Sequence, residues 1–86
     1  MALEVERQDP WEVEETDTFG GEANYCWVNR WSLPDGLTHK QLVRRAKKLA
    51  GWSGQRCRVE DNGDMIRIDP IGHDAPCRVI FIYYQY

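Results

Sequence analysis

The side chains best suited to nucleophilic or metal chemistry are three cysteines and two histidines, Cys26, Cys57, Cys77, His39 and His73. No two of them have the spacing of a zinc or redox motif, and no phosphate-binding glycine loop or nucleophile elbow occurs. His39 falls in the first turn of a predicted helix and His73 in a loop, so no imidazole is placed beside a thiol. We therefore expect a protein that is not an enzyme, with no cofactor and no metal. The cysteines are expected to stay reduced and to pack as small apolar side chains.

Charge is segregated along the chain. Residues 1–22 hold eight acidic residues against one basic residue, whereas residues 23–86 hold six acidic against ten basic residues. Such asymmetry is typical of contact with nucleic acid or with a charged protein surface, and it also allows the acidic part to cover the protein's own basic face. We predict an acidic N-terminal arm over residues 1–21, ending at Gly20-Gly21, followed by one domain over residues 22–86.

The candidate partner-binding residues are charged side chains of the arm, of a predicted helix and of a predicted hairpin. They are Lys40, Arg44, Lys47, Lys48, Arg56, Arg58, Arg67, Glu12, Glu14 and Glu15. Clustered bases bind polyanions with release of counterions, and an acidic arm can present carboxylates where a partner expects phosphates. The plainer interpretations are a solvated helix face and a solubilising terminus.

The clearest predicted element is a helix from Thr38 to Ala50. Thr38 and Gln41 have the spacing of a capping box, and Gly51 follows as a C-terminal cap. Its apolar stripe holds Leu42, Val43, Ala46, Leu49 and Ala50. Residues 24–31 are expected to form a strand whose aromatic side chains, Tyr25, Trp27 and Trp31, either stack on nucleic-acid bases or belong to the core.

A hairpin is predicted over residues 55–60 and 65–69, with Asn62-Gly63 as the central pair of a type I′ turn. That register sets Val59 opposite Ile66 and Arg58 opposite Arg67, a repulsive pair that an anionic neighbour would relieve. The core face of the hairpin is then Cys57, Val59, Ile66 and Ile68.

Residues 77–84 are expected to form the last strand. This strand is apolar on both faces, which predicts a central position covered twice. The helix covers one face, and the arm, a second subunit or a partner covers the other. The fold class expected is α+β, in the order β-α-β-β-β, with an antiparallel or mixed sheet and one helix packed on a face.

Residues 20–28 and Arg30 resemble a phrase found in short uncharacterised bacteriophage and prophage proteins, as do Ala46-Lys47, residues 51–54 and residues 56–58. The size and element order are similar to small anti-CRISPR proteins. This resemblance implies a phage protein that binds a host protein or ribonucleoprotein complex and blocks a nucleic-acid-handling defence system.

Two other functions remain open: a small nucleic-acid-binding modulator with a self-masking arm, and a structural or assembly homodimer. No stretch has the length and apolarity of a membrane span, and the N-terminus lacks the basic-then-apolar layout of a signal peptide. We therefore expect a cytoplasmic protein of the bacterial host cell.

Overall fold

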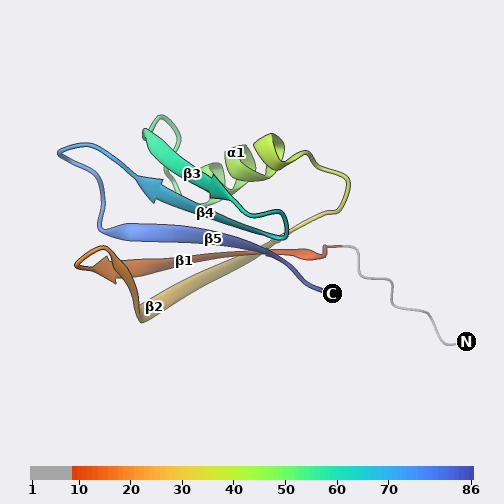
Figure 1. Cartoon of the computed structure of the whole chain (residues 1–86), viewed down its shortest axis with the longest axis horizontal. Helices are drawn as coiled ribbons and strands as arrows, with labels where there is room; N and C mark the ends of the chain where they lie inside the picture. The colour runs from red at the N-terminus through yellow and green to blue at the C-terminus, as the bar shows by residue number, and fades with distance from the viewer. Residues whose placement is uncertain (1–8) are drawn as a thin grey trace, which may run out of the picture.

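The computed structural model describes residues 9–86 as one five-stranded antiparallel sheet with one helix on a face. The elements are β1 (Trp11–Phe19), β2 (Glu22–Leu33), α1 (His39–Leu49), β3 (Cys57–Asp61), β4 (Met65–Pro70) and β5 (Arg78–Tyr84). The strand order is β2-β1-β5-β4-β3, and α1 lies on the side of β3, β4 and β5, with β2 at the far side of the sheet (Figure 1). The predicted α+β class is confirmed.

The prediction of an arm over residues 1–21 is wrong for β1. Residues 1–8 lie outside the described part of the chain, but Trp11–Phe19 forms a strand paired with β2 on one side and β5 on the other. Trp11 and Val13 point into the core, where they are 7% and 0% exposed. Alternation of apolar and acidic residues suits a strand with one buried face, so the element order gains a strand at its start.

The far end of the β1–β2 hairpin departs from regular pairing. The register shifts between Thr16 and Thr18, and Tyr25 has a φ of 57°, the one positive value among the non-glycine residues that the structure describes. Trp31 packs against the core on the α1 side, whereas the Tyr25 hydroxyl donates to Glu14 on the opposite face. The three aromatic side chains therefore do not share one face: Trp31 packs on the core, whereas Tyr25 and Trp27 are exposed, so neither the platform nor the core interpretation holds for all three.

Helix α1 begins and ends as predicted. Thr38 Oγ1 accepts from the Gln41 amide at 3.1 Å, and Gln41 Oε1 accepts from the Thr38 amide at 2.9 Å, which completes the capping box. At the other end Gly51 has a φ of 79°, and the amide of Trp52 donates to the carbonyl of Lys47 at 2.7 Å, in a Schellman motif.

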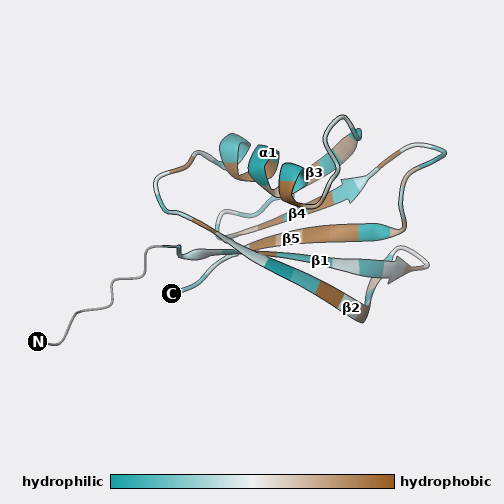
Figure 2. Cartoon of the chain, turned by 180° about the vertical axis from the view of Figure 1, so that it is seen from behind, coloured by the Kyte–Doolittle hydropathy of each residue, from teal (hydrophilic) through white to brown (hydrophobic). Residues whose placement is uncertain are grey.

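The apolar stripe of α1 is narrower than predicted. Leu42 and Ala46 are fully buried, but Leu49 is 41% exposed. Figure 2 shows the resulting division, with hydrophilic colour on the outer side of α1 and hydrophobic colour toward the sheet. The outer side carries the basic residues that the sequence singled out.

The hairpin of β3 and β4 has a different register from the one predicted. Asp61 pairs with Ile66 and Val59 with Ile68, and the amide of Asn62 donates to the carbonyl of Met65. Gly63, with a φ of 90°, therefore takes the first central position of the turn, as in type II′, rather than the second position of type I′. The expected contact of Arg58 with Arg67 is wrong, because Arg58 lies opposite Asp69.

Strand β5 is central and buried on both faces, as its apolar sequence predicts. Ile80 and Ile82 face α1, and Val79 and Phe81 lie on the opposite face, which we call the open face; all are at most 8% exposed. The chain itself covers part of the open face. There, Nη2 of Arg67 donates to the carbonyl of Gly21 at 3.2 Å, so the end of the β1–β2 hairpin reaches as far as β4.

Two of the cysteines do not pack as predicted: Cys26 and Cys77 are exposed, and Cys57 is half-buried. Residues 9–86 contain no group of three histidine, cysteine or acidic side chains that could hold a metal ion. Within that same part of the chain, no helix has both the length and the apolar character needed to cross a membrane.

Candidate functional site

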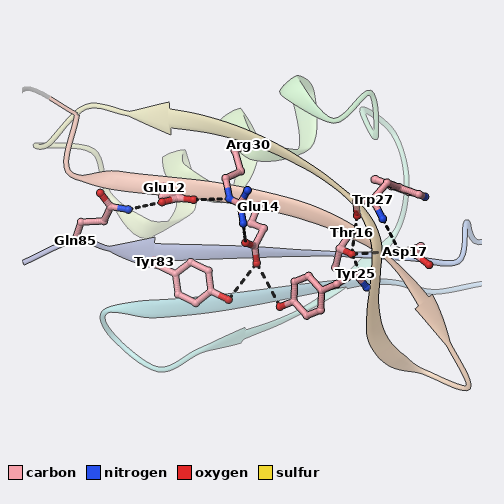
Figure 3. Close-up of polar contacts among 9 residues, drawn as sticks. All are labelled: Glu12, Glu14, Thr16, Asp17, Tyr25, Trp27, Arg30, Tyr83 and Gln85. Carbon is pink, nitrogen blue, oxygen red and sulfur yellow. Dashed lines mark hydrogen bonds and ion pairs between the residues drawn. The ribbon is translucent and has the colours of Figure 1, made fainter.

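The acidic residues of β1 are held by neighbouring strands. On the open face, Arg30 of β2 bridges two of them, with Nε 3.0 Å from Glu12 and Nη2 3.1 Å from Glu14. Gln85 also donates to Glu12. Figure 3 shows this chain of contacts running along β1 from Gln85 to Glu14. The carboxylates predicted to meet a partner are engaged within the protein at these two positions.

Glu14 also lies between two tyrosines. The Tyr25 hydroxyl donates to Glu14 Oε1 at 3.3 Å, and the Tyr83 hydroxyl approaches the same oxygen at 3.5 Å from the other side (Figure 3). Burial, together with the charge of Glu14, raises the pKa of Tyr83 above its ordinary range. Glu14 is 7% exposed, so its carboxylate is surrounded by donors rather than presented to solvent.

Glu15 points to the other face of the sheet and is the most deeply buried acid of β1, with 2% exposure. Its Oε2 accepts from Trp52 Nε1 at 3.1 Å and from Arg78 Nη1 at 3.0 Å, and Asn29 donates to Oε1 at 3.3 Å. This carboxylate joins β1 to β2, β5 and the loop after α1. Its role is to hold these elements together.

Asp17 lies at the register shift of β1 and accepts from amides of β2 that have no strand partner where the pairing breaks. It accepts from the backbone of Cys26 at 2.9 Å, from the backbone of Trp27 at 3.4 Å and from the side chain of Asn24 at 2.9 Å. These bonds, that of Asn24 above all, lower the pKa of Asp17 to about 2. Asp17 thus fixes the bend of the hairpin.

Arg67 is separated from the bases of α1, because it lies on the open face of β4. Its guanidinium pairs with Asp69 at 2.9 Å and sits 5.4 Å above the ring centre of Phe81. The bond to Asp69 raises the pKa of Arg67. Arg67 helps to close the open face and does not belong to the same surface as the helix.

The remaining predicted bases lie on α1 and on or beside β3, and we call those of α1 the basic surface. They are Lys40, Arg44, Lys47 and Lys48 of the prediction, with Arg45. The predicted Arg56 and Arg58 are exposed too, but Arg58 lies opposite Asp69 on the open face of the sheet. Within residues 9–86, no acidic side chain lies within ion-pair distance of any of these groups. Lys47 Nζ donates to the carbonyl of Gln55 at 2.8 Å, which ties the helix to the loop before β3.

Grooves run along both sides of α1. On the β3 side, a groove of about 540 Å³ and a smaller one of about 280 Å³ share Lys40 and Val43, and we treat them together as the α1–β3 groove. Its lining residues are His39, Lys40, Val43, Arg44, Lys47, Ser53, Gly54, Val59 and Asp61. On the β2 side, a groove of about 650 Å³ is lined by Ser32, Leu33, Arg45, Lys48 and Leu49.

The α1–β3 groove combines cationic and apolar groups. Val59 was predicted to lie in the core, but it is 45% exposed, because α1 covers β4 and β5 more completely than the edge strand β3. One end of the groove is closed by His39, whose Nδ1 lies 2.7 Å from Asp61. The Gly63 amide and then His39 lower the pKa of Asp61, so its charge is engaged locally.

The structure therefore separates residues that the sequence grouped together. Glu12, Glu14, Glu15 and Arg67 are engaged within the sheet. Lys40, Arg44, Lys48 and Arg58 remain exposed, and Lys47 is half-buried. Sequence reasoning missed Val43 and Val59 as surface groups, and the short, charged sequence of β3 was the available sign of an edge strand. Comparison of the chain with family models, with curated proteins and with solved structures found no match.

Proposed function

We propose that this protein is a phage-encoded inhibitor of the anti-CRISPR type, which acts by binding and not by catalysis. It docks onto an acidic protein surface of a nucleic-acid-handling defence complex in the cytoplasm of the bacterial host and blocks that complex sterically. The phage origin rests on the resemblance of residues 20–28, Arg30, Ala46-Lys47, residues 51–54 and residues 56–58 to phage proteins. The target rests on the similarity of size and predicted element order to small anti-CRISPR proteins, an order to which the structure adds β1. The mode of binding rests on the basic surface.

The observation that carries the proposal is the contrast between the paired acids and the unpaired bases. Glu12, Glu14 and Glu15 of β1 are bound to Arg30 and Arg78 within the sheet, away from the basic surface, which keeps a locally positive field despite a net charge of −3 for the whole chain. A positive patch of this kind steers association with a complementary negative surface.

A protein is favoured over nucleic acid as the partner because apolar side chains lie among these bases. Leu49 and Val59 are 41% and 45% exposed, and both line grooves beside α1. The exposed aromatic side chains that could stack on bases, Tyr25 and Trp27, belong instead to the far part of β2. Apolar groups mixed with arginine are typical of protein interfaces.

The proposal is tested by expressing the protein in bacteria that carry an RNA-guided defence system and measuring the plating efficiency of a targeted phage. Wild type is expected to restore plating, and Arg44→Gln to lose most of that effect. His73→Glu is the matched control, since it lowers the net charge equally at an exposed loop position. Equal activity of Arg44→Gln and wild type would exclude the basic surface as the site that binds the target.

A gel-shift assay on the purified full chain separates the alternative of a nucleic-acid-binding modulator. The proposal expects no shift of short DNA or RNA at physiological salt. Tight binding that falls steeply with salt would instead favour the modulator. Sedimentation of the same sample tests the homodimer, since a dimer that survives dilution favours an assembly role.

A further inference from the structure

Strand β3 ends the sheet, and nothing in residues 9–86 pairs with its outer side. Its residues Cys57, Val59 and Asp61 share one face, and Val59 lies opposite the fully buried Ile68, which faces α1. Yet Val59 is 45% exposed, so the apolar layer between helix and sheet stops before it reaches β3. The edge strand and α1 therefore form the two walls of the α1–β3 groove.

The two walls offer different bonds. The outer side of β3 offers backbone amides and carbonyls in a row, which is the template for adding a strand. The α1 wall offers Lys40, Arg44 and Lys47 above the apolar side chains of Val43 and Val59. An occupant that satisfies both walls needs an extended backbone, carboxylates toward the helix and an apolar side chain near Val59.

We propose that the α1–β3 groove binds an extended acidic segment of the partner protein, which adds to β3 as a further antiparallel or parallel strand. This inference rests on the proposed function and specifies its partner. Alternate side chains of an added strand point to the same face, so acidic and apolar residues two positions apart reach the groove together. Main-chain bonds to β3 give affinity, and the bases of α1 give selectivity for acidic sequences.

The other edge of the sheet is a poorer template. In β2, the register shift and the positive φ of Tyr25 break the strand, and the amides of Cys26 and Trp27 turn inward to Asp17. Such irregularities are a common protection of edge strands against pairing. The β3 edge has no comparable break in its pairing with β4.

The probe is a capped peptide, Ser-Glu-Ser-Val-Ser-Glu-Ser-Glu, which places valine and the glutamates on one face of a strand. It is titrated into the isotope-labelled full chain while backbone amide spectra are recorded. We expect saturable shifts in β3 and α1 and slower hydrogen exchange in β3. Arg44→Gln should weaken binding about tenfold, whereas Arg45→Gln, on the other groove, should change it less than twofold.

A second peptide, with proline replacing the serines on both sides of valine, keeps the charges but cannot pair as a strand. The inference expects it to bind at least about tenfold more weakly. Equal binding of both peptides, or no binding of the first, overturns strand addition even if the phage assay succeeds. If the protein is a dimer in which the β3 amides exchange slowly without peptide, the β3 edge pairs with a second copy. That result also overturns the inference. If the wild-type protein binds the first peptide but does not restore phage plating, only the proposed function is refuted.

Discussion

The β1–β2 hairpin and the α1–β3 region are both rich in charge, but they use it in different ways. In the hairpin, each acid from Glu12 to Glu15 accepts a bond from a basic or amide side chain, and two of these acids are less than a tenth exposed. Around α1, the basic side chains point outward, and no acidic side chain of residues 9–86 lies at ion-pair distance from them. Local density of charge in a sequence therefore does not tell whether that charge serves the fold or a partner.

Burial distinguishes the two uses. A carboxylate removed from water needs donors on every side, so its position is fixed by several strands at once. A base on an exposed helix face needs none, and its side chain stays available for an encounter. We therefore expect substitutions in the hairpin to change the free energy of unfolding, and substitutions on the basic surface to change binding.

The largest effect is expected for Glu15→Ala. Removal of this buried carboxylate leaves Trp52 Nε1 without its acceptor and Arg78 without its partner, at a cost of about 3 kcal/mol. The free energy of unfolding from urea titration checks this value. Glu15→Gln is the control, since an amide oxygen still accepts from the indole and should recover part of the loss. A cost of Glu15→Ala below about 1 kcal/mol would contradict the role assigned to this side chain.

A smaller effect is expected for Gly63→Val in the turn between β3 and β4. The φ of Gly63 is 90°, and an added Cβ would meet no atom within 4 Å, so the penalty comes from the backbone alone. We expect a loss of about 1–2 kcal/mol in the same titration. Gly63→Asn should cost less, because asparagine tolerates positive φ better. Equal stability of the valine variant would show that the turn differs from the one described.

Replacement of Thr38 by alanine is expected to cost about 1 kcal/mol, because the Gln41 amide loses its acceptor at the start of α1. Thermal and urea unfolding both measure this loss. Thr38→Ser retains the hydroxyl and serves as the control. An unchanged midpoint in Thr38→Ala would mean that the capping box does not stabilise the helix that carries the basic surface.

The bend of the hairpin should make stability depend on pH in the acid range. The pKa of Asp17 is lowered from 3.8 to about 2 in the folded protein. A lowered pKa means that the ionised carboxylate adds stability above pH 4, and that this contribution is lost as the pH falls toward 2. In Asp17→Asn, the decline of the melting temperature between pH 4 and 2 should be shallower than in wild type. Parallel pH profiles for the two proteins would refute this account.

The smallest effect on folding is expected on the basic surface. Arg44→Gln should change the free energy of unfolding by no more than about 0.5 kcal/mol, because its guanidinium has no ion-pair partner within residues 9–86. The same urea titration as for Glu15→Ala measures it. A destabilisation near that of Glu15→Ala would contradict the distinction between the two regions. The reduced phage plating with Arg44→Gln would then be explained by a folding defect.

The helix and the last strand can be predicted from local sequence signals. Features that depend on contacts between distant parts of the chain cannot. The cap of α1 is specified by Thr38 and Gln41 within one turn, and β5 is recognisable because both of its faces are apolar. The sequence of β1 predicts an arm because the alternation of Trp11 to Glu14 breaks at Glu15, an acidic residue at an inward position. Only the donors Trp52 and Arg78, distant in sequence, make burial of that carboxylate acceptable.

The candidate binding surface was predicted in part for the same reason. The bases of α1 follow from helical periodicity alone, so they were found. The exposure of Val59 depends on where α1 ends its coverage of the sheet, and the register of β3 depends on which residue starts the turn. Asn62-Gly63 fits two registers that keep the same faces, and local sequence does not distinguish them.

The position of β1 between β2 and β5 has a consequence for how the chain acquires its structure during synthesis. Trp11 pairs with Tyr84, so the middle of the sheet joins the beginning of the described chain to its end. Strand β5 must be synthesised before it can pair with β1. Until then, β1 is paired only with β2. Proteins with such distant pairings fold slowly for their size. Completion of the sheet therefore has to wait until β5 has been synthesised, and chaperone dependence is expected to be greatest before that point.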